Sequence, residues 1–180
     1  MEVNYFDIDG PFEVFPKIFQ DERGIFFESF RAETFLDLGI KKAFIQDNHS
    51  VSKKNVLRGI HFQLEPYQQA KLIRVTYGKA YDIAVDLRPG SNTFGKYISV
   101  ILDSEMYNMF YIPEGFGHGF VALEDCILQY KCTSYYYPTA DTGIRWNDTD
   151  LKINWPVKNP ILSKKDSELP SLQSFIDNNI

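Results

Sequence analysis

The stretch KLIRVTYGKAYDIAVDLRPGSN, residues 71–92, decides the fold class. Its first part, 71–77, alternates apolar and polar side chains and stops at a Gly-Lys pair, and 80–87 forms a second apolar-rich run that Arg-Pro-Gly-Ser-Asn closes. Two more runs of this kind follow, at 96–102 and 127–134. Short strand-like segments separated by Gly, Pro and Asn predict an antiparallel sandwich or barrel, so we expect an all-β fold.

Two segments have helical rather than alternating spacing. In residues 32–38 apolar side chains recur three positions apart, and Gly39 follows as a stop signal. The tail from Ser171 places Leu172 and Phe175 on one helical face. We therefore expect two short helices beside the strands.

Length, charge and cysteine content narrow the class of protein. The chain shows no internal repeat, linker or low-complexity segment, so we expect one domain over residues 1–180. A net charge of −5 and a pI near 5.2 argue against nucleic acid or an anionic membrane as a partner. Cys126 and Cys132, about 20 Å apart on one strand, are too distant to form a disulfide. With no leader and no apolar run of bilayer length, we expect a cytoplasmic protein.

Three histidines, His49, His61 and His118, are available for acid–base or metal chemistry. A strand at 58–63 would place Gly59, His61 and Gln63 on one face, a pattern typical of a polar interior. The glycines around His118 suit a close backbone approach or simply a tight turn. A lone histidine is more often structural than catalytic. The three could converge on a metal, but no His-x-His spacing or His/Glu cluster supports this, so we expect none.

Three other features have two interpretations each. Tyr130 shares a strand face with Leu128 and Cys132, and a tyrosine packed in the core is the simpler explanation. Lys71 opens a strand whose alternate residues are apolar, so its ammonium lies either at the barrel rim or inside a cavity. The tyrosine run at 135–137 is either a packed edge or a platform for stacking on a base.

Taken together, these motifs give the chain a resemblance over nearly its full length to the dTDP-4-dehydrorhamnose 3,5-epimerase family of sugar-nucleotide epimerases. The matching blocks, in order, are DERG (21–24), FESF (27–30), QDNHS (46–50), LRGIHFQ (57–63), KLIRV (71–75), DIAVDLR (82–88), IPEGFGHGF (112–120), YK (130–131), WND (146–148) and LSKKD (162–166). The resemblance implies a cupin-like jelly-roll β-barrel with a few short helices.

The resemblance also implies catalytic roles. His61 matches the base, Asp166 the carboxylate that orients its imidazole, Tyr130 the acid on the opposite face, and Lys71 the lysine near the 4-keto oxygen. The chemistry suits these residue types, because C3 and C5 both lie next to the ketone and a neutral imidazole is an effective base near pH 7. A lysine ammonium or a nearby histidine would stabilise the enolate oxygen. No cofactor is required, and the sequence has no glycine-rich dinucleotide loop.

Nucleotide-sugar contacts are implied for a second set of residues. These are Arg23, Glu28, Gln46, Asn48, Arg58, His118, Asp141 and Lys165, with Tyr136 as the tyrosine that stacks on the base. Arg23 and Glu28 are expected to reach the neighbouring subunit's site, which implies a homodimer with shared active sites. Asp141 stands where the family has glutamate, Ala70 replaces a glycine and Gly117 replaces an alanine, and these departures leave the substrate open.

The expected function is therefore inversion at C3, C5 or both in a nucleotide-linked 4-keto sugar, with dTDP-4-keto-6-deoxyglucose as the first candidate. A different nucleotide sugar, such as a GDP-linked 4-keto heptose or deoxyhexose, is an alternative. A sugar 3,4-ketoisomerase is another. A non-enzymatic sugar-binding or structural barrel is a fourth, but it would not need His61, Asp166, Tyr130 and Lys71 together.

Overall fold

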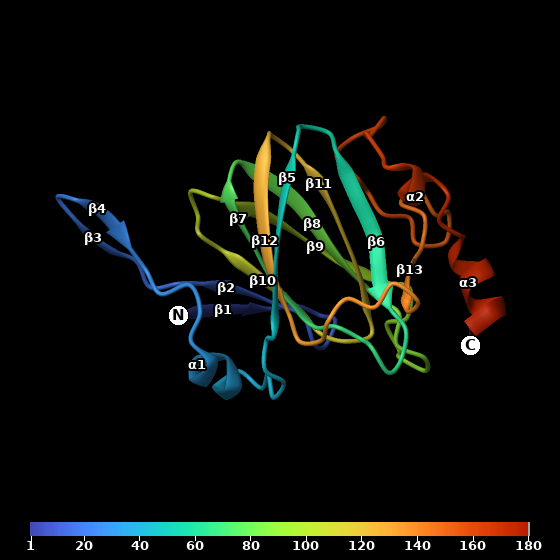
Figure 1. The fold of residues 1–180 in the computed structure, drawn as a ribbon, viewed down its shortest axis with the longest axis horizontal. Helices are drawn as coiled ribbons and strands as arrows, with labels where there is room; N and C mark the ends of the chain where they lie inside the picture. The colour runs from blue at the N-terminus through green and yellow to red at the C-terminus, as the bar shows by residue number, and fades with distance from the viewer. Residues whose placement is uncertain (180) are drawn as a thin grey trace.

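Two antiparallel sheets face each other in the computed structural model, which describes residues 1–179 (Figure 1). The first sheet contains, in spatial order, β1 (Glu2–Tyr5), β2 (Phe12–Phe15), β10 (Met109–Ile112), β7 (Lys71–Tyr77), β12 (Cys126–Cys132) and β5 (Gln46–Ser52). The second contains β13 (Asp141–Gly143), β6 (Leu57–Gln63), β11 (Phe116–Ala122), β8 (Lys79–Asp86) and β9 (Tyr97–Asp103). The predicted all-β class is confirmed.

The helices are few and short, as expected. Helix α1 (Ala32–Asp37) ends just before the predicted stop at Gly39, and α3 (Leu172–Asn179) forms the C-terminal helix. A third helix, α2 (Lys164–Ser167), was not predicted. Within residues 1–179 no helix is long and apolar enough to cross a membrane.

The main core lies between the two sheets. Ile73 on β7, Ala84 on β8, Phe110 on β10 and Leu128 on β12 are all fully buried there. Alternation puts Lys71 on the same inward side of β7 as Ile73. Burying a large apolar side chain contributes about 1.5–3 kcal/mol, so this cluster fixes the spacing of the sheets.

Two outer faces are covered by other parts of the chain. Leu172 and Phe175 of α3 pack with Ile83 on the outer side of the second sheet. Phe35 of α1 packs with Met109 against the first sheet. The hairpin of β3 (Phe19–Asp21) and β4 (Gly24–Phe26) instead extends away from the barrel (Figure 1).

A β-bulge in β6 corrects one expectation from the sequence. The pairing of β6 with β11 shifts so that Gly59 and Ile60 together oppose Gly119. Gly59 has φ +117°, and a Cβ there would lie 2.6 Å from the Gly119 Cα, so only glycine fits. The predicted shared face of Gly59 and His61 is therefore wrong. The bulge instead directs Arg58 and His61 toward the same cavity.

Candidate active site

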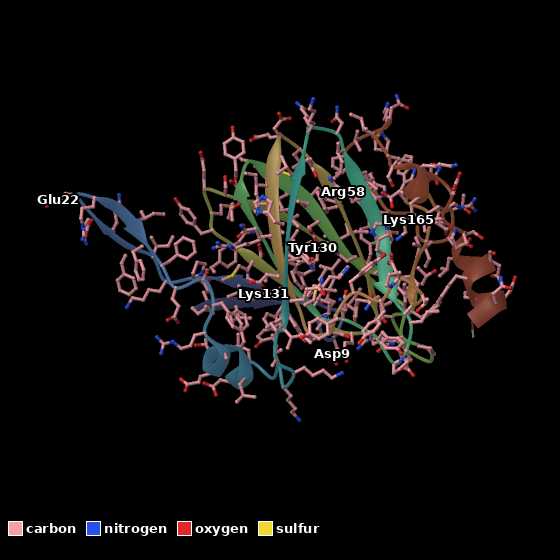
Figure 2. The ribbon with its side chains drawn as sticks, viewed as in Figure 1. Asp9, Glu22, Arg58, Tyr130, Lys131 and Lys165 are labelled. Atoms are coloured by element: carbon pink, nitrogen blue, oxygen red, sulfur yellow. The ribbon has the colours of Figure 1, made fainter. Side chains whose placement is uncertain are left out.

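Two adjoining cavities, of about 340 and 300 Å³, lie between the sheets. Both are lined by His61, Lys71, Tyr130 and Lys165. Every predicted site residue except Arg23 and Glu28 lines at least one of them. Figure 2 shows Arg58, Tyr130 and Lys165 on the side of the barrel where β5 and β6 face the viewer.

His61 and Asp166 form a hydrogen-bonded pair on one wall. The His61 Nε2 lies 2.5 Å from the Asp166 Oδ1, and Asp166 is only 3% exposed. Ser163 caps α2 by accepting a hydrogen bond from the Asp166 N–H, and the bridge between Val56 and Ile161 ties this segment to β6. The cap at Ser163 and the bridge at Ile161 thus hold the Asp166 carboxylate beside His61, although the two residues are far apart in the sequence.

The electrostatics of this pair favour an ionised carboxylate. Burial alone would raise the pKa of Asp166, but the hydrogen bond and charge of His61, with the Ser163 bond and Lys165, hold that pKa below its ordinary value. A carboxylate accepts hydrogen bonds and does not donate them. His61 therefore carries its proton on Nε2 when neutral, which leaves the Nδ1 lone pair for a substrate proton.

Tyr130 and Lys71 occupy the opposite wall, on neighbouring strands of the first sheet. The Lys71 ammonium lies 5.9 Å from the centroid of the Tyr130 ring. Burial lowers the pKa of Lys71, against the charges of Cys132, Asp82 and Asp141, and burial raises the pKa of Tyr130. Tyr130 is therefore a neutral hydrogen donor at neutral pH. Lys71 points into the cavity, which decides between its two predicted positions.

Several polar atoms in the cavity have no protein partner within residues 1–179. These are the His61 Nδ1, the His118 Nδ1, the Lys71 Nζ and the Tyr130 hydroxyl. No fully buried side-chain nitrogen or oxygen of the described residues lacks a partner. These four atoms must therefore be reachable from the cavity, where a ligand could bind them.

A second histidine–aspartate pair lies deeper in the barrel. The His118 Nε2 is 3.0 Å from both carboxylate oxygens of Asp82, which is fully buried on β8. Asp82 was not among the site residues predicted from the sequence. Its signal was present, because Asp82 alternates with Ala80 and Ala84 on a face that is otherwise small and apolar.

Five of the residues predicted to contact the nucleotide sugar form one hydrogen-bonded chain. The Gln46 amide donates to the Asn48 Oδ1 at 3.1 Å, while the Gln46 Oε1 accepts from the Tyr136 N–H at 2.9 Å. The Tyr136 hydroxyl donates to the Asp141 Oδ2 at 2.9 Å, and the Lys165 ammonium pairs with the same oxygen. The shorter acid at position 141 is thus engaged inside the protein. Tyr136 is half exposed beside it, in a position suited to stacking.

Arg58 lies on the wall of the smaller cavity, whereas Gly117 and Ala70, two of the three departures from the family, line neither cavity. Arg58 donates from Nε to the Ser52 hydroxyl and from Nη2 to the Val51 carbonyl, both at 3.2 Å, and has no ion pair among the described residues. A Cβ at Gly117 would lie 2.6 Å from an Ile60 methyl, so Ile60 fills the space that the family's alanine would need. The third departure, Ala70, is buried and donates its N–H to Thr133.

Three predicted or considered residues lie outside the cavities. Arg23 is on the protruding hairpin, where its side chain is 86% exposed and paired with Asp21, and Glu28 pairs with Arg31. Figure 2 marks Glu22, the neighbour of Arg23, at the far tip of that hairpin. His49 faces the outer side of β5 and contacts Gln129, so it cannot join the other two histidines. Residues 1–179 contain no group of three His, Cys, Asp or Glu placed to hold a metal.

Comparison with known proteins identifies the family of the chain. The family model for dTDP-4-dehydrorhamnose 3,5-epimerase matches residues 5–174. The chain belongs to this family. The dTDP-4-dehydrorhamnose 3,5-epimerase of Escherichia coli (strain K12) is 49% identical over 164 residues, which cover 89% of both chains.

Solved structures of epimerases have the same fold. The enzyme from Legionella pneumophila Philadelphia 1, in complex with dTDP-4-keto-L-rhamnose, is 43% identical with a TM-score of 0.92, and the match covers 96% of this chain and 93% of that one. A 3′-monoepimerase from Streptomyces bikiniensis, in complex with dTDP-quinovose, is 35% identical with a TM-score of 0.90, covering 96% and 89%. The predicted family, cupin-like fold and epimerase class are confirmed, and the ketoisomerase and binding-module alternatives are not supported.

Proposed function

We propose that this epimerase inverts C3 and C5 of dTDP-4-keto-6-deoxyglucose, with His61 as base and Tyr130 as acid. The observation that carries the proposal is the placement of His61, paired with Asp166 of α2, on the second sheet and of Tyr130 on the first, with Lys71 beside Tyr130. A base and an acid on opposite sides of a planar intermediate are what inversion requires.

The reaction starts when the His61 Nδ1 takes the proton from a carbon next to the ketone. The electron pair moves onto the 4-keto oxygen, and the Lys71 ammonium stabilises the enolate charge. Asp166 stabilises the imidazolium that forms at 2.5 Å from its carboxylate. Tyr130 then gives its hydroxyl proton to the opposite face of the carbon. The His61 imidazolium gives its proton to solvent and the Tyr130 phenolate takes one from solvent, which restores both groups for the second carbon. The same residues serve C3 and C5 in turn.

The substrate and the number of centres rest on the relatives. The Legionella and Streptomyces structures each hold a dTDP-linked sugar, which favours thymidine over a GDP-linked substrate. The chain is 49% identical to a 3,5-epimerase and 35% identical to a monoepimerase, so inversion of both centres is the stronger candidate. Inversion of C3 alone is the second candidate.

Deuterium exchange tests the assignment of the base. The protein is incubated in D₂O with dTDP-4-keto-6-deoxyglucose, and label at C3 and C5 is followed by mass spectrometry. His61→Asn should lower exchange at both carbons by about 10²–10⁴-fold. His49→Asn is the matched control, since His49 faces away from the cavity, and it should exchange like the wild type. Exchange within a few-fold of wild type in His61→Asn would contradict the proposal.

The proposal includes a homodimer in which Arg23 completes the partner's site. Arg23 is exposed on a hairpin that also exposes Phe19 (53%) and Phe26 (70%), a pattern typical of a surface covered by another protein. Arg23→Ala and His61→Asn should each be inactive, yet a mixture of the two should regain activity because one hybrid site contains neither change. Activity is measured after the subunits of the mixed dimers have exchanged, and native mass spectrometry checks that hybrid dimers have formed. A mixture that remains inactive despite hybrid dimers would contradict the shared site.

A further inference from the structure

The inner histidine–aspartate pair has a geometry that fixes one proton. Asp82 is fully buried, and its two carboxylate oxygens lie at the same distance, 3.0 Å, from the His118 Nε2. A ring N–H shared between two acceptor oxygens gives this symmetric arrangement, whereas a protonated carboxyl would approach the ring through one oxygen. The two equal contacts therefore favour an ionised Asp82 with the His118 proton on Nε2, although burial raises the pKa of Asp82 against the charges of His118 and Lys71.

The other ring nitrogen of His118 opens to the cavity. It has no partner within residues 1–179, and no fully buried side-chain nitrogen there lacks one, so the His118 Nδ1 is accessible. Burial lowers the pKa of His118, and the nearby Lys71 and His61 act in the same direction against Asp82. A neutral ring with its proton on Nε2 has only a lone pair at Nδ1.

We propose that Asp82 is a positioning residue that fixes His118 as a hydrogen-bond acceptor for a hydroxyl of the substrate's sugar ring. This inference rests on the proposed function for the presence of a sugar in the cavity. An acceptor at the His118 Nδ1 would repel the 4-keto oxygen, so the enolate must take its hydrogen bond from Lys71. A hydroxyl is the sugar group that can donate to Nδ1.

The assignment resolves the two donors that the sequence left open for the enolate. Lys71 and His118 both line the smaller cavity, of about 300 Å³, and of these two only Lys71 can donate a hydrogen bond there. His118 instead orients the ring that Lys71 and His61 act upon. The two histidines thus share one tautomer and serve different purposes, since the His61 Nδ1 accepts from carbon and the His118 Nδ1 from oxygen.

Nitrogen NMR tests the tautomer on the free protein, before any question of activity. With ¹⁵N-histidine labelling there are three rings to assign, and His49→Asn and His61→Asn identify two of them. We expect the His118 ring to carry its proton on Nε2 and none on Nδ1. Asp82→Asn should move the proton to Nδ1, because the new amide can donate to Nε2. A wild-type ring protonated on Nδ1, or on both nitrogens at pH 7, would overturn the proposal.

Binding of fluorinated analogues tests the hydroxyl. Fluorine accepts hydrogen bonds weakly and cannot donate, so wild-type protein should bind dTDP-glucose about 10-fold or more tightly than the analogue with fluorine at C2 or at C3. In Asp82→Asn that difference should shrink to about 2-fold, because the His118 Nδ1 becomes a donor. An unchanged preference, or no preference for either analogue in wild type, would overturn the proposal.

Asp86→Asn is the matched control for damage to the fold. Asp86 is fully buried on the same strand, but its carboxylate binds Arg88, Ser91 and Thr93 rather than the cavity. This variant should keep both the His118 tautomer and the preference for hydroxyl over fluorine. Wild-type protein that shows the expected tautomer but exchanges no deuterium into a 4-keto sugar would sink the proposed function and leave the Asp82 assignment standing.

Discussion

Asp166→Asn is the change that tests the proposed base most directly, because it preserves shape and removes one charge. Asp166 is 3% exposed, and its Oδ1 lies 2.5 Å from the His61 Nε2. The asparagine amide can donate to Nε2, so the neutral ring would carry its proton on Nδ1. The lone pair that takes the substrate proton would then face the asparagine instead of the sugar.

The structure sets the size of the effect. Two unit charges at the observed 2.5 Å attract by about 7 kcal/mol at an effective dielectric of about 20, and solvent around the partly exposed imidazole reduces this to about 3 kcal/mol. Restoring the productive tautomer costs a further 1–3 kcal/mol or so, the value of a broken buried hydrogen bond. A total near 4–6 kcal/mol corresponds to a loss of about 10³–10⁴-fold in kcat.

Deuterium exchange and nucleotide binding together measure the outcome. Deuterium exchange should fall by about 10³–10⁴-fold. The affinity for dTDP should stay within about 2-fold, since Asp166 is not among the residues predicted to contact the nucleotide. Lys164→Ala is the control on the same helix, because Lys164 is 88% exposed, and it should behave like wild type. Exchange within 10-fold of wild type in Asp166→Asn would refute the argument that the carboxylate fixes the tautomer of His61.

The same variant has a consequence for stability. The pKa of Asp166 is held below its ordinary value in the folded protein, so its ionised form stabilises the fold above about pH 4. That stabilisation is lost as the pH falls through the folded-state pKa. The gap in melting temperature between wild type and Asp166→Asn should therefore narrow between about pH 5 and pH 2 in thermal melts. A gap that is constant across this range would contradict the assigned shift.

Four further outcomes follow from the site. Tyr130→Phe should retain exchange at the first carbon while inverted product falls sharply, with a melting temperature near wild type because its hydroxyl has no partner within residues 1–179; equal small losses would favour a core tyrosine. Burial lowers the pKa of Lys71, so kcat/KM should fall as the pH rises toward 10. Lys71→Arg should be slower but should not show this fall, because arginine stays charged. The same fall of kcat/KM in Lys71→Arg would mean that another group titrates. Exhaustive chelation should leave the rate unchanged, and a stoichiometric metal whose removal abolishes activity would overturn the expectation. Calorimetry should show tighter binding of dTDP than of GDP, and the reverse would favour a GDP-linked substrate.

The central strands were predictable because their signals are local. Alternation in 71–77 and 80–87 sets the facing sides of β7 and β8, and Gly78, with φ +73°, makes the turn between them. Boundaries differ by a residue or so, as for the strand expected at 96–102 and found at Tyr97–Asp103. The two-residue periodicity was enough to predict which side chains of these strands face inward, because each sheet packs one of its faces against the other sheet.

Features that depend on contacts between distant segments were not predictable. The bulge at Gly59 arises where β6 meets β11: a glycine within a strand suggests a bulge, but only the pairing with β11 shows which side chains it redirects. Helix α2 has only Lys164–Ser167 to define it, too few residues for helical periodicity. Which side of β5 faces inward also required the fold, and it separates His49 from the cavity. The sequence alone favoured a core tyrosine at Tyr130, and only the fold places its ring beside the Lys71 ammonium in the cavity.

The charges of the cavity explain how a protein with a net charge of −5 could bind a nucleoside diphosphate. The three aspartates in or next to the cavity each accept a hydrogen bond from a neighbouring side chain. His61 donates to Asp166, His118 to Asp82, and Lys165 and Tyr136 to Asp141. The negative charges of the cavity are therefore compensated within the protein.

Lys71 and Arg58 are the cavity cations that have no ion pair among residues 1–179. Lys71 lies beside Tyr130, where an enolate would form, and Arg58 lies at the more exposed side, where a diphosphate would enter. Pairing the aspartates internally therefore leaves two unpaired positive charges for the two negative groups of the proposed reaction. Placing a carboxylate beside Arg58, as in Ser52→Asp, should weaken dTDP binding by about 10-fold while leaving the His61–Asp166 pair intact.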